Sequence, residues 1–547
     1  MPPTYVNIPS GTSRIDIQTA ITGMTAGGTM HFAAGEYIID SALNLLPNIR
    51  FVGDGMRASV FKLTAGSATP FEAVNLSNIS FENLGFVYEG GTFSYIVRGT
   101  TTSGNHGNIV VKNCRFSNFN ASSRFCIDFK DVNDCRVDGC QFENVWCGVS
   151  IRAGTKDVYR NTCFNCDFKN FEYAGVYATL VSPYCTFGTS VIGCRASKTN
   201  VVASGGLANP ILFNGPRATP IVAWHMDVLI ANNVIIGPGA AYSVGTVSTS
   251  DQFYLSNLNG GVVAGNIAAQ GGANGMLIWA SNKVAICANQ CDKNYANGIL
   301  GTGISNCAMT GNVCTNNGSS ASSEDAGIAL NPDMGVDLAT SNNLLVGNLC
   351  TDDQTTKLQN YGIFTFLSAG SGASVSNTTA GANRVTGNVT AGEEVIDQSI
   401  NDFGSDGLYG SLAQDPQFEV YDAEITIPAS TSIPSAGYSL GYAIPAGTVL
   451  RSVQAIIRKP TASVFTSGST GTAFSIGYDS SHAAEYGTST GKVWNSKITH
   501  RSVALNASAV PLLLFPVGGT LTIGTSALVL RLKVTYERAV DPLPIYT

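Results

Sequence analysis

The chain has 547 residues and a net charge of −7; 12% of its residues are charged and 44% are hydrophobic. The acidic balance disfavours nucleic acid as a partner, because phosphate binding needs clustered Lys and Arg. No stretch of about 18 apolar residues occurs, so no membrane span is predicted. Residues 1–12 lack the basic and apolar regions of a secretory leader, and none is expected there.

A short amphipathic helix is expected near the N-terminus. Ile17, Ala20 and Ile21 follow one another at helical spacing after Ser13, which is a suitable N-cap. Repeat folds need elements that cover their open ends. We therefore expect a capping helix over residues 14–22.

A short alternating pattern that ends in Cys or Asn recurs along residues 110–388. Its last residues are Cys114, Cys140, Cys166, Cys194, Asn233, Asn266, Asn289, Asn312, Asn348 and Asn388. A base period near 23–26 residues with longer insertions is typical of a solenoid. Because the strands are short and helical periods are missing, the pattern predicts an all-β fold, a parallel β-helix with coils about 4.8 Å apart.

The 14 cysteines follow this repeat rather than the spacing of a metal site. Cys163 and Cys166 form a lone C-x-x-C pair, without the second pair of a zinc ribbon. We expect buried free thiols that pack as small hydrophobic groups, with no metal site and no cofactor.

A second strand in each coil indicates which residues face inward and which face outward. The inward residues are expected to be Ile127, Val149, Val176, Ile211, Met276, Ile299, Ile328 and Ile363. The outward residues are expected to be Asp128, Lys130, Ser150, Arg152, Tyr177, Asn214, Trp279, Asn331, Phe364 and Phe366. Alternation of side chains along a strand is the basis for both sets.

The repeat stops after Asp415-Pro416, and alternating strands divided by Gly and Pro turns follow. These strands predict an antiparallel β-sandwich or jelly roll that serves trimerisation or carbohydrate binding. The expected organisation is a cap with the first coils over residues 1–55, a β-helix over residues 56–412, and the sandwich over residues 413–547.

Residues 17–21, 27–39 and 48–55 resemble the opening of the pectate-lyase-like superfamily, which implies a right-handed parallel β-helix. A β-helix that ends in a sandwich is similar to bacteriophage tailspike depolymerases. That resemblance implies a homotrimer on the virion tail, extracellular to the host, which binds and degrades capsule, O-antigen or exopolysaccharide. The capping motif begins almost at Met1, so a virion anchor is expected to be short, absent or supplied by a baseplate or adaptor protein.

The expected outward face suits a linear glycan, since aromatic rings stack on sugars and polar groups orient them. The candidate substrate-binding residues are Arg152, Tyr177, Trp146, Trp279, Asn214 and His225. Tyr177, Trp279, Phe364 and Phe366 form an exposed aromatic series on this face, with burial under a loop or at a trimer interface as the alternative for each of them. His225 lies in residues 224–227, within the insertion that gives the longest early step between repeats.

Glycoside hydrolysis uses two carboxyl groups about 5 Å or about 6.5–9.5 Å apart. The candidates are Asp128, Glu143 and Glu172, with Glu324, Asp325 and Asp333 further along the chain. The expected register places Glu172 over Trp146, where an acid gains a raised pKa, and Glu143 over Lys169. Polygalacturonase motifs are missing, since Asp352-Asp353 is the lone acidic pair.

The alternatives are a lyase, a non-catalytic adhesin, and a secreted pectate-lyase-like enzyme or epimerase. A lyase needs a base and cations that neutralise a uronic carboxylate. Its candidates are Arg152, Lys156, Arg160, Arg217 and His225. The sequence favours hydrolysis slightly over elimination, and bacterial surface polysaccharide as the ligand.

Overall fold

The computed structural model describes residues 4–64, 66, 68–197, 209–216, 220–237, 251–318, 325–333, 338–365, 375–376, 378–381, 383–388 and 401–403, and the strands between residues 418 and 538. The chain divides into two compact units, Met1–Gly407 and Leu408–Thr547. Among the described residues, no helix has the length and apolar character needed to cross a membrane.

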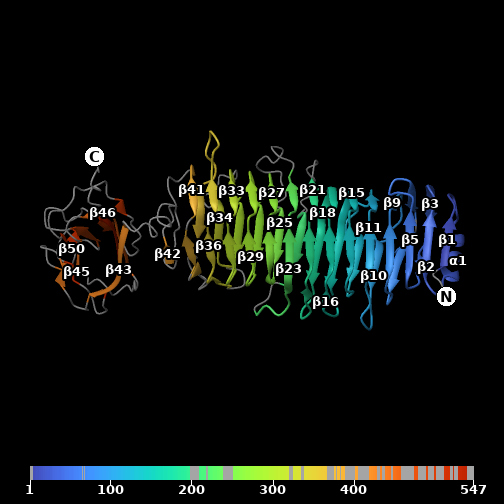
Figure 1. Ribbon diagram of the computed structural model, residues 1–547, viewed down its shortest axis with the longest axis horizontal. Coiled ribbons are helices and arrows are strands. Elements are labelled where there is room, and N and C mark those ends of the chain that lie inside the picture. Colours follow the sequence, from blue (N-terminus) through green and yellow to red (C-terminus); the bar gives the residue numbers. More distant parts are fainter. Residues whose placement is uncertain are drawn as a thin grey trace, which may run out of the picture. The chain divides into compact units, whose positions relative to one another are not determined.

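The first unit is built from two large sheets of parallel strands (Figure 1). One sheet contains β1 (Thr4–Ile8), β2 (Gly28–Phe32), β5 (Ile49–Gly53), β8 (Ile79–Glu82), β11 (Ile109–Lys112), β14 (Arg136–Asp138), β16 (Val158–Tyr159), β17 (Thr162–Phe164), β19 (Thr186–Phe187), β20 (Ser190–Ile192), β23 (His225–Ala231), β26 (Leu258–Ala264), β29 (Ala285–Cys287), β32 (Ala308–Thr310), β36 (Leu344–Val346), β40 (Thr379–Gly381) and β42 (Asn401–Phe403).

The other sheet contains β3 (Gly35–Ile39), β4 (Leu43–Asn44), β6 (Ser59–Leu63), β7 (Phe71–Val74), β9 (Gly85–Tyr88), β10 (Tyr95–Thr100), β12 (Arg115–Ser117), β13 (Phe125–Lys130), β15 (Gln141–Ala153), β18 (Asp167–Leu180), β21 (Arg195–Ser197), β22 (Ile211–Asn214), β24 (Val234–Ile236), β25 (Phe253–Ser256), β27 (Ile267–Ala269), β28 (Met276–Trp279), β30 (Gln290–Asp292), β31 (Ile299–Thr302), β33 (Val313–Thr315), β34 (Ala326–Asn331), β37 (Leu349–Thr351), β38 (Tyr361–Thr365) and β41 (Arg384–Thr386). A short parallel pair, β35 (Thr340–Ser341) and β39 (Val375–Ser376), accompanies them.

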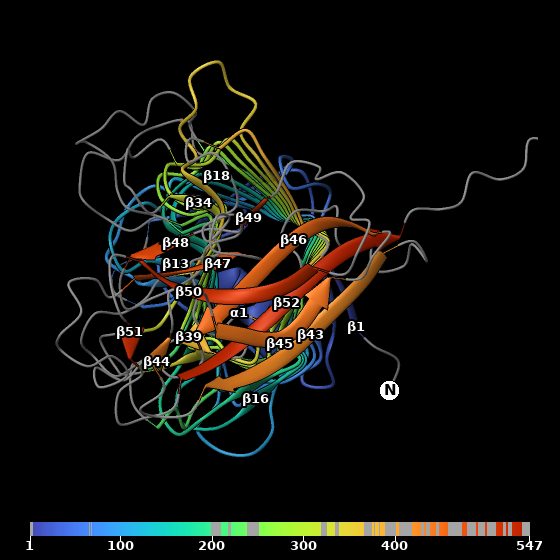
Figure 2. The same ribbon diagram turned by 90° about the vertical axis from the view of Figure 1, so that its left-hand side faces the viewer.

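Each strand pairs with the strand one coil away, which confirms the predicted parallel β-helix. Val111 pairs with Val137, and Val137 pairs with Cys163, at steps of one sequence repeat. In Figure 2 the successive strands of this unit line up behind one another, as stacked coils require. Neighbours on its surface are therefore residues one coil apart in the sequence.

The capping helix is confirmed as α1 (Arg14–Gly23), which lies at the N-terminal end of the solenoid in Figure 1. The Ser13 side chain accepts a hydrogen bond from the backbone N–H of Asp16 at 3.2 Å. Ile17 and Ile21 are buried on one side of the helix. The helix thus covers apolar groups that the first coil leaves open.

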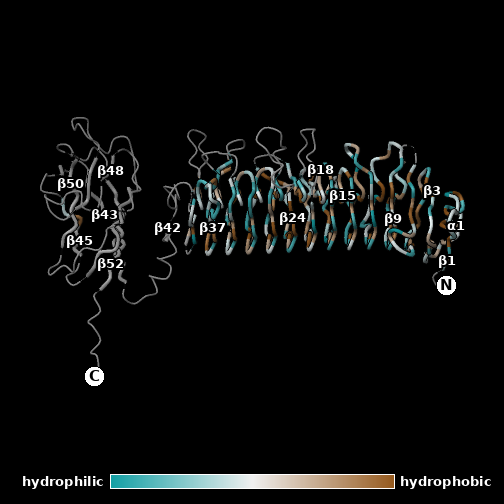
Figure 3. Tube along the Cα trace, turned by 90° about the horizontal axis from the view of Figure 1, so that it is seen from above, coloured by the Kyte–Doolittle hydropathy of each residue, from teal (hydrophilic) through white to brown (hydrophobic). Residues whose placement is uncertain are grey.

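The interior of the solenoid is a column of stacked apolar side chains. Phe86, Phe116, Phe142 and Phe168 occupy the same position on four coils, with centroid separations of 4.7, 5.1 and 4.8 Å. These separations match the strand spacing of a sheet, so the backbone repeat itself sets the ring stacking. Hydrophobic and hydrophilic residues alternate along the coils in Figure 3.

A ladder of buried amides runs along one corner. The Asn233 Nδ2 donates to Asn266 Oδ1 at 2.9 Å, and the same bond continues on later coils. The rungs are Asn233, Asn266, Asn289, Asn312, Asn348 and Asn383. The predicted last rung, Asn388, is wrong. It lies five residues beyond Asn383 and accepts a hydrogen bond from Gln359 in a different column.

The inward column of the second strand is confirmed from Ile127 to Ile363, with one coil added. β25 lies between β22 and β28, where Ile211 pairs with Phe253 and Phe253 pairs with Met276. The sequence repeat missed this coil because 42 residues separate Ile211 from Phe253, although Met276 follows Phe253 at the base period of 23 residues. The outward set is correct in direction for its described members, several of which are covered, while Phe366 lies outside the described residues.

The prediction of buried free thiols is confirmed for most of the cysteines. All fourteen are free, and all but Cys185 and Cys287 are buried. Their positions follow the coils, as with Cys114, Cys140, Cys166 and Cys194 at the corner that the amide ladder later occupies.

In the second unit, the backbone of ten antiparallel strands is described. They are β43 (Phe418–Ile427), β44 (Ser432–Ile433), β45 (Tyr438–Ile444), β46 (Thr448–Ile457), β47 (Ala473–Gly477), β48 (Thr488–Thr490), β49 (Ile498–Thr499), β50 (Val510–Val517), β51 (Leu521–Thr522) and β52 (Leu528–Arg538). They form sheets in the orders β43-β52-β46-β49, β45-β50-β47-β48 and β44-β51. β43, β52 and β46 are visible side by side in Figure 2. The predicted sandwich and the domain boundaries at 55 and 412 stay predictions.

Candidate functional site

The strongest concentration of charged and aromatic side chains lies on the outer face of β10, β13, β15 and β18. In one outward column Arg98 pairs with Asp128, Asp128 with Ser150, and Ser150 with Tyr177. A second outward column, two residues further along each strand, holds Thr100, Lys130, Arg152 and Thr179. Side chains from four coils therefore meet on one surface.

Asp128 is the centre of this surface, but it is fully buried, so its expected exposure is wrong. Arg152, from the next coil, donates from Nε to Asp128 Oδ1 at 2.7 Å and from Nη2 to Oδ2. Arg98, from the preceding coil, places Nε 3.4 Å from Oδ2. The two guanidinium groups cover the carboxylate from both sides, which explains its burial.

A second carboxyl group joins this cluster through Arg98. The Arg98 Nη1 donates to Glu72 Oε1 at 2.8 Å, and the Glu72 side chain is 32% exposed. Arg98 pairs with Glu72 on one side and with Asp128 on the other. The two acids are thus two coils apart, about 9.6 Å between their strands.

The guanidinium groups also contact an aromatic ring. The Cζ atoms of Arg98 and Arg152 lie 4.6 and 5.5 Å from the centroid of Tyr95, and Arg152 Nη2 donates to the Tyr95 hydroxyl at 3.2 Å. Burial acts to lower the pKa of Arg152, but the charge of Asp128 and its hydrogen bonds raise that pKa above its ordinary value. The surface therefore keeps a fixed cation beside an aromatic face.

Five half-buried rings continue from this point and form what we call the aromatic surface: Tyr95, Phe125, Trp146, Tyr173 and Tyr177. Tyr95 stacks on Phe125 with centroids 5.8 Å apart, and Phe125 meets the edge of Trp146 at 5.2 Å. Trp146 stacks on Tyr173 at 4.3 Å, and Tyr173 meets Tyr177 edge-on at 5.4 Å. The rings brace one another, so the surface is formed before any ligand binds.

A bulge in β18 determines which residue contacts Trp146. Two residues, Glu172 and Tyr173, stand opposite Trp146, and the register shifts there. The Tyr173 ring stacks on Trp146, so the expected placement of Glu172 over Trp146 is wrong. Burial raises the pKa of the Tyr173 hydroxyl, with Tyr177 adding to the shift. Glu172 is half-buried beside the aromatic surface.

Glu143 lies far from Asp128. Its predicted pairing with Lys169 is confirmed, but Ser150, the partner of Asp128, is seven residues further along β15. That separation is about 23 Å of extended strand. Arg115 donates to Glu143 at 2.8 Å, and this hydrogen bond lowers the pKa of Glu143. A general acid needs the opposite shift.

Two expected aromatic platforms are covered. Trp279 is 6% exposed, and its Nε1 donates to the carboxylate of Asp333. Phe364 is 8% exposed and stacks on Tyr361 at 4.7 Å. For Trp279 and Phe364 the alternative of burial is therefore the observed one, because residues of the same face and of the segment after β34 pack over them.

His225 is fully buried, which contradicts its expected role on the surface. Its Nδ1 lies 2.8 Å from the Thr186 hydroxyl, and its Nε2 lies 3.4 Å from the backbone oxygen of Asn214. Burial lowers the pKa of His225 to about 3. The Asn214 side chain is half-buried at the end of β22, in line with Thr179.

Other candidates lie elsewhere. Arg160 is bound to Asp134 at 2.6 Å at the edge of the other sheet, and Lys156 Nζ donates to the Gly104 oxygen. Asp325 is buried. Arg217, Glu324 and Phe366 lie outside the described residues.

Sequence reasoning missed Glu72, Tyr95, Arg98, Phe125 and Tyr173. Tyr95 and Arg98 belong to a coil that precedes the first aligned repeat. The alternation Tyr95-Ile96-Val97-Arg98 carried the needed signal, since Val97 pairs with Ile127. The bulge that presents Tyr173 has no such signal.

No family model matches the chain, and no curated protein matches it. Among solved structures, the Dettilon tailspike protein is 13% identical, with 96% of this chain and 92% of that chain covered and a TM-score of 0.46. The A-module of mannuronan C-5 epimerase AlgE4 from Azotobacter vinelandii is 15% identical, covering 73% and 100%, with a TM-score of 0.40. The catalytic unit of the GH87 α-1,3-glucanase from Streptomyces thermodiastaticus is 13% identical, covering 72% and 71%, with a TM-score of 0.43.

These proteins are right-handed parallel β-helices of the pectate-lyase-like superfamily. This chain is itself a parallel β-helix by its own strand pairing. At these identities and TM-scores the likenesses carry no argument about function, so the chemistry of the site must be argued from the residues of this chain.

Proposed function

We propose that this chain binds a polysaccharide along the aromatic surface and cleaves it. One observation carries the proposal. Five half-exposed rings, two guanidinium groups and two carboxyl groups lie next to one another on consecutive coils of a rigid face. Rings of this kind stack on the apolar faces of sugars, and the charged groups orient hydroxyl or acidic substituents. The regular coil spacing suits a ligand that is itself a linear repeat.

For the cleavage step, hydrolysis by Glu72 and Asp128 is the mechanism that we favour. Their strands lie about 9.6 Å apart, close to the separation of about 6.5–9.5 Å between the carboxyl groups of inverting glycosidases. Glu72 reaches solvent, and Arg98 lies between the two acids. Asp128 is the residue of this pair that the sequence already indicates. Glu172, beside Trp146, is retained as a further candidate acid, and Glu143 contributes at most to binding.

A non-catalytic glycan-binding adhesin is the second candidate. The full burial of Asp128 and its two hydrogen bonds to Arg152 favour it, because a reacting carboxylate must reach the substrate. In that case the Arg152–Asp128 pair only holds the binding surface in shape.

The biological setting that we propose is that of a bacteriophage tailspike-like depolymerase: a homotrimer on the virion tail, acting outside the host on its capsule, O-antigen or exopolysaccharide, with a baseplate or adaptor protein as its virion partner. The order of a β-helix followed by antiparallel strands, which resembles that of tailspike depolymerases, supports it. Sedimentation equilibrium tests the trimer, for which a mass of a single 57.0 kDa chain is the contradicting result.

The cleavage test is incubation with a panel of purified bacterial surface polysaccharides, followed by product mass and ultraviolet absorbance. Products that gain one water per cleaved bond support hydrolysis. Products with an absorbing unsaturated uronate indicate a lyase, and retention of the protein on an intact polymer indicates an adhesin. Glu72→Gln is the matched variant for hydrolysis, since it keeps the shape of a residue outside the core. Once a bacterial host has been identified, failure of the protein to bind any surface polysaccharide of that host contradicts the proposal.

A further inference from the structure

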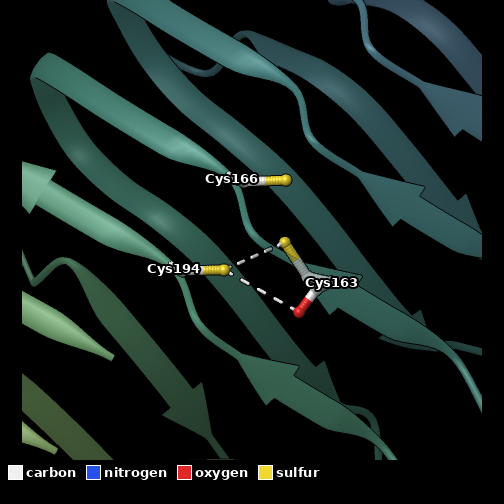
Figure 4. A group of neighbouring side chains, drawn as sticks. All are labelled: Cys163, Cys166 and Cys194. Carbon is white, nitrogen blue, oxygen red and sulfur yellow. Dashed lines mark hydrogen bonds between the residues drawn. The ribbon is translucent and has the colours of Figure 1, made fainter. Parts of the chain in front are cut away.

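The C-x-x-C pair of the sequence gains a third cysteine in three dimensions. Cys163 lies on β17, Cys166 follows that strand, and Cys194 follows β20 one coil further on. Their three sulfur atoms lie within 4.8 Å of one another, and all three residues are buried. Figure 4 shows the Cys163 side chain pointing toward the gap between the other two.

The separation of two of these sulfurs matches that of ligands on one metal ion. Cys163 Sγ and Cys194 Sγ are 3.8 Å apart. Two thiolates on a tetrahedral zinc ion, each at about 2.3 Å, lie about 3.8 Å apart. Cys166 and Cys194 are neighbours in the column that also contains Cys114 and Cys140, so stacking alone brings these two sulfurs together. Stacking in that column does not require Cys163, from β17, to bring its sulfur to the same point.

A second column of cysteines has no additional sulfur of this kind among the described residues. Cys291 pairs with Cys314, and Cys314 pairs with Cys350, at one position on three successive coils. The outer two are two coils apart, about 9.6 Å between strands, which is too far for one ion to bridge. Among the described residues, Cys163, Cys166 and Cys194 form the one group of three that meets the distance condition.

We propose that Cys163, Cys166 and Cys194 form a binding site for one thiophilic divalent d10 cation, of which zinc is the common biological example. Binding replaces two thiol protons, which pass to solvent, and the two thiolates balance the charge of the ion. The third sulfur remains a neutral ligand, so no net charge is buried. The sulfurs are sealed inside the solenoid, and the ion enters while the coils form.

The test is to express the untagged full-length chain in zinc-supplemented medium, purify it under a thiol reductant and a mild chelator, and measure zinc per chain by mass spectrometry. We expect about one zinc per chain, retained by Cys314→Ala and lost by Cys163→Ala. Circular dichroism of each variant checks the fold. Zinc below a tenth of an equivalent in the wild-type chain overturns the proposal, as does equal loss in Cys314→Ala or full retention in Cys163→Ala.

A second measurement needs no variant. The wild-type chain expressed in cobalt-supplemented medium is expected to show sulfur-to-cobalt charge-transfer bands, since cobalt occupies tetrahedral zinc sites. Cobalt that co-purifies without these bands is bound elsewhere, and this result overturns the proposal even where Cys163→Ala fails to fold.

Discussion

Arg152 donates to Asp128 from the neighbouring coil, with Nε 2.7 Å from Oδ1, and this contact joins β15 to β13 on the outer face. The carboxylate has no exposed surface. A buried charge that loses its partner costs far more than an exposed one. The pair is therefore a stability element as well as part of the candidate site.

Replacement of Arg152 by Ala is expected to destabilise the chain by about 3 kcal/mol, because Asp128 would stay buried with only the longer contact to Arg98. Chemical denaturation measures the change. Arg160→Ala, which breaks an exposed pair with Asp134, is the control and is expected to leave the midpoint unchanged. Equal midpoints for Arg152→Ala and the wild-type chain would show that Asp128 gains nothing from the pair.

Removal of the Trp146 ring is expected to weaken polysaccharide binding about tenfold, or about 1.4 kcal/mol, because Tyr173 loses its stacking partner and the sugar loses a platform. Tyr177→Ala is expected to have a similar effect. Affinity electrophoresis in gels that contain the polymer measures the change. Tyr159→Ala is the control, since Tyr159 stacks on Phe187 in the other sheet. If Tyr159→Ala weakens binding as much as Trp146→Ala does, the aromatic surface is not the polysaccharide-binding site.

The buried His225 predicts an acid-sensitive fold. Its pKa is about 3 in the folded chain, against about 6.5 when unfolded. Between these two pKa values the unfolded state binds a proton at His225 and the folded state does not. The free energy of unfolding is therefore unaffected by His225 above about pH 6.5 and decreases as the pH falls below that value. Between pH 7 and pH 5 the loss is about 2 kcal/mol.

Denaturation midpoints at the two pH values measure this loss. His225→Gln is expected to flatten the pH dependence. An unchanged slope in His225→Gln would assign the acid sensitivity to other groups.

We expect one buried asparagine of the amide ladder to contribute several times more to the free energy of unfolding than one exposed asparagine pair. Asn289→Ala removes the donor to Asn312 Oδ1 and to the Val263 oxygen. It also removes the acceptor of the Asn266 backbone N–H and one of the two acceptors of Asn266 Nδ2. We expect a loss of about 3 kcal/mol in the free energy of unfolding, since buried polar groups are left unpaired.

Asn78→Gly is the matched control for the ladder. Asn78 donates to Asn48 in an exposed pair, and its φ of 60° suits glycine. A smaller effect is expected in thermal unfolding. If the control lowers the stability as much as Asn289→Ala does, burial does not explain the contribution of the ladder to stability.

Much of the fold follows from the sequence because, in a solenoid, the length of the sequence repeat determines which residues pair between neighbouring strands. The alignment that places Val149 beside Val176 also places Tyr177 beside Ser150, as observed. The repeat length predicts the wrong partner where a strand contains an extra residue, as at Glu172 and Tyr173. It also fails where a long insertion precedes a coil, as before β25.

Exposure at the candidate site was harder to predict than register. Alternation places Asp128 and Trp279 outward, and both do point outward. Arg152 covers the first and Asp333 is bonded to the second, through contacts between side chains of different coils. A single-strand pattern contains no information about such contacts.

The rungs from Asn233 to Asn348 all donate toward the following coil, so the ladder has a direction. An amide turned the other way would set two NH2 groups or two oxygens against each other, and neighbouring rungs would have to turn with it. A slip of one residue in any coil would likewise leave its rung without an acceptor. The ladder therefore ties the register of each of these coils to that of the next, and a shifted coil would bury unpaired amide groups.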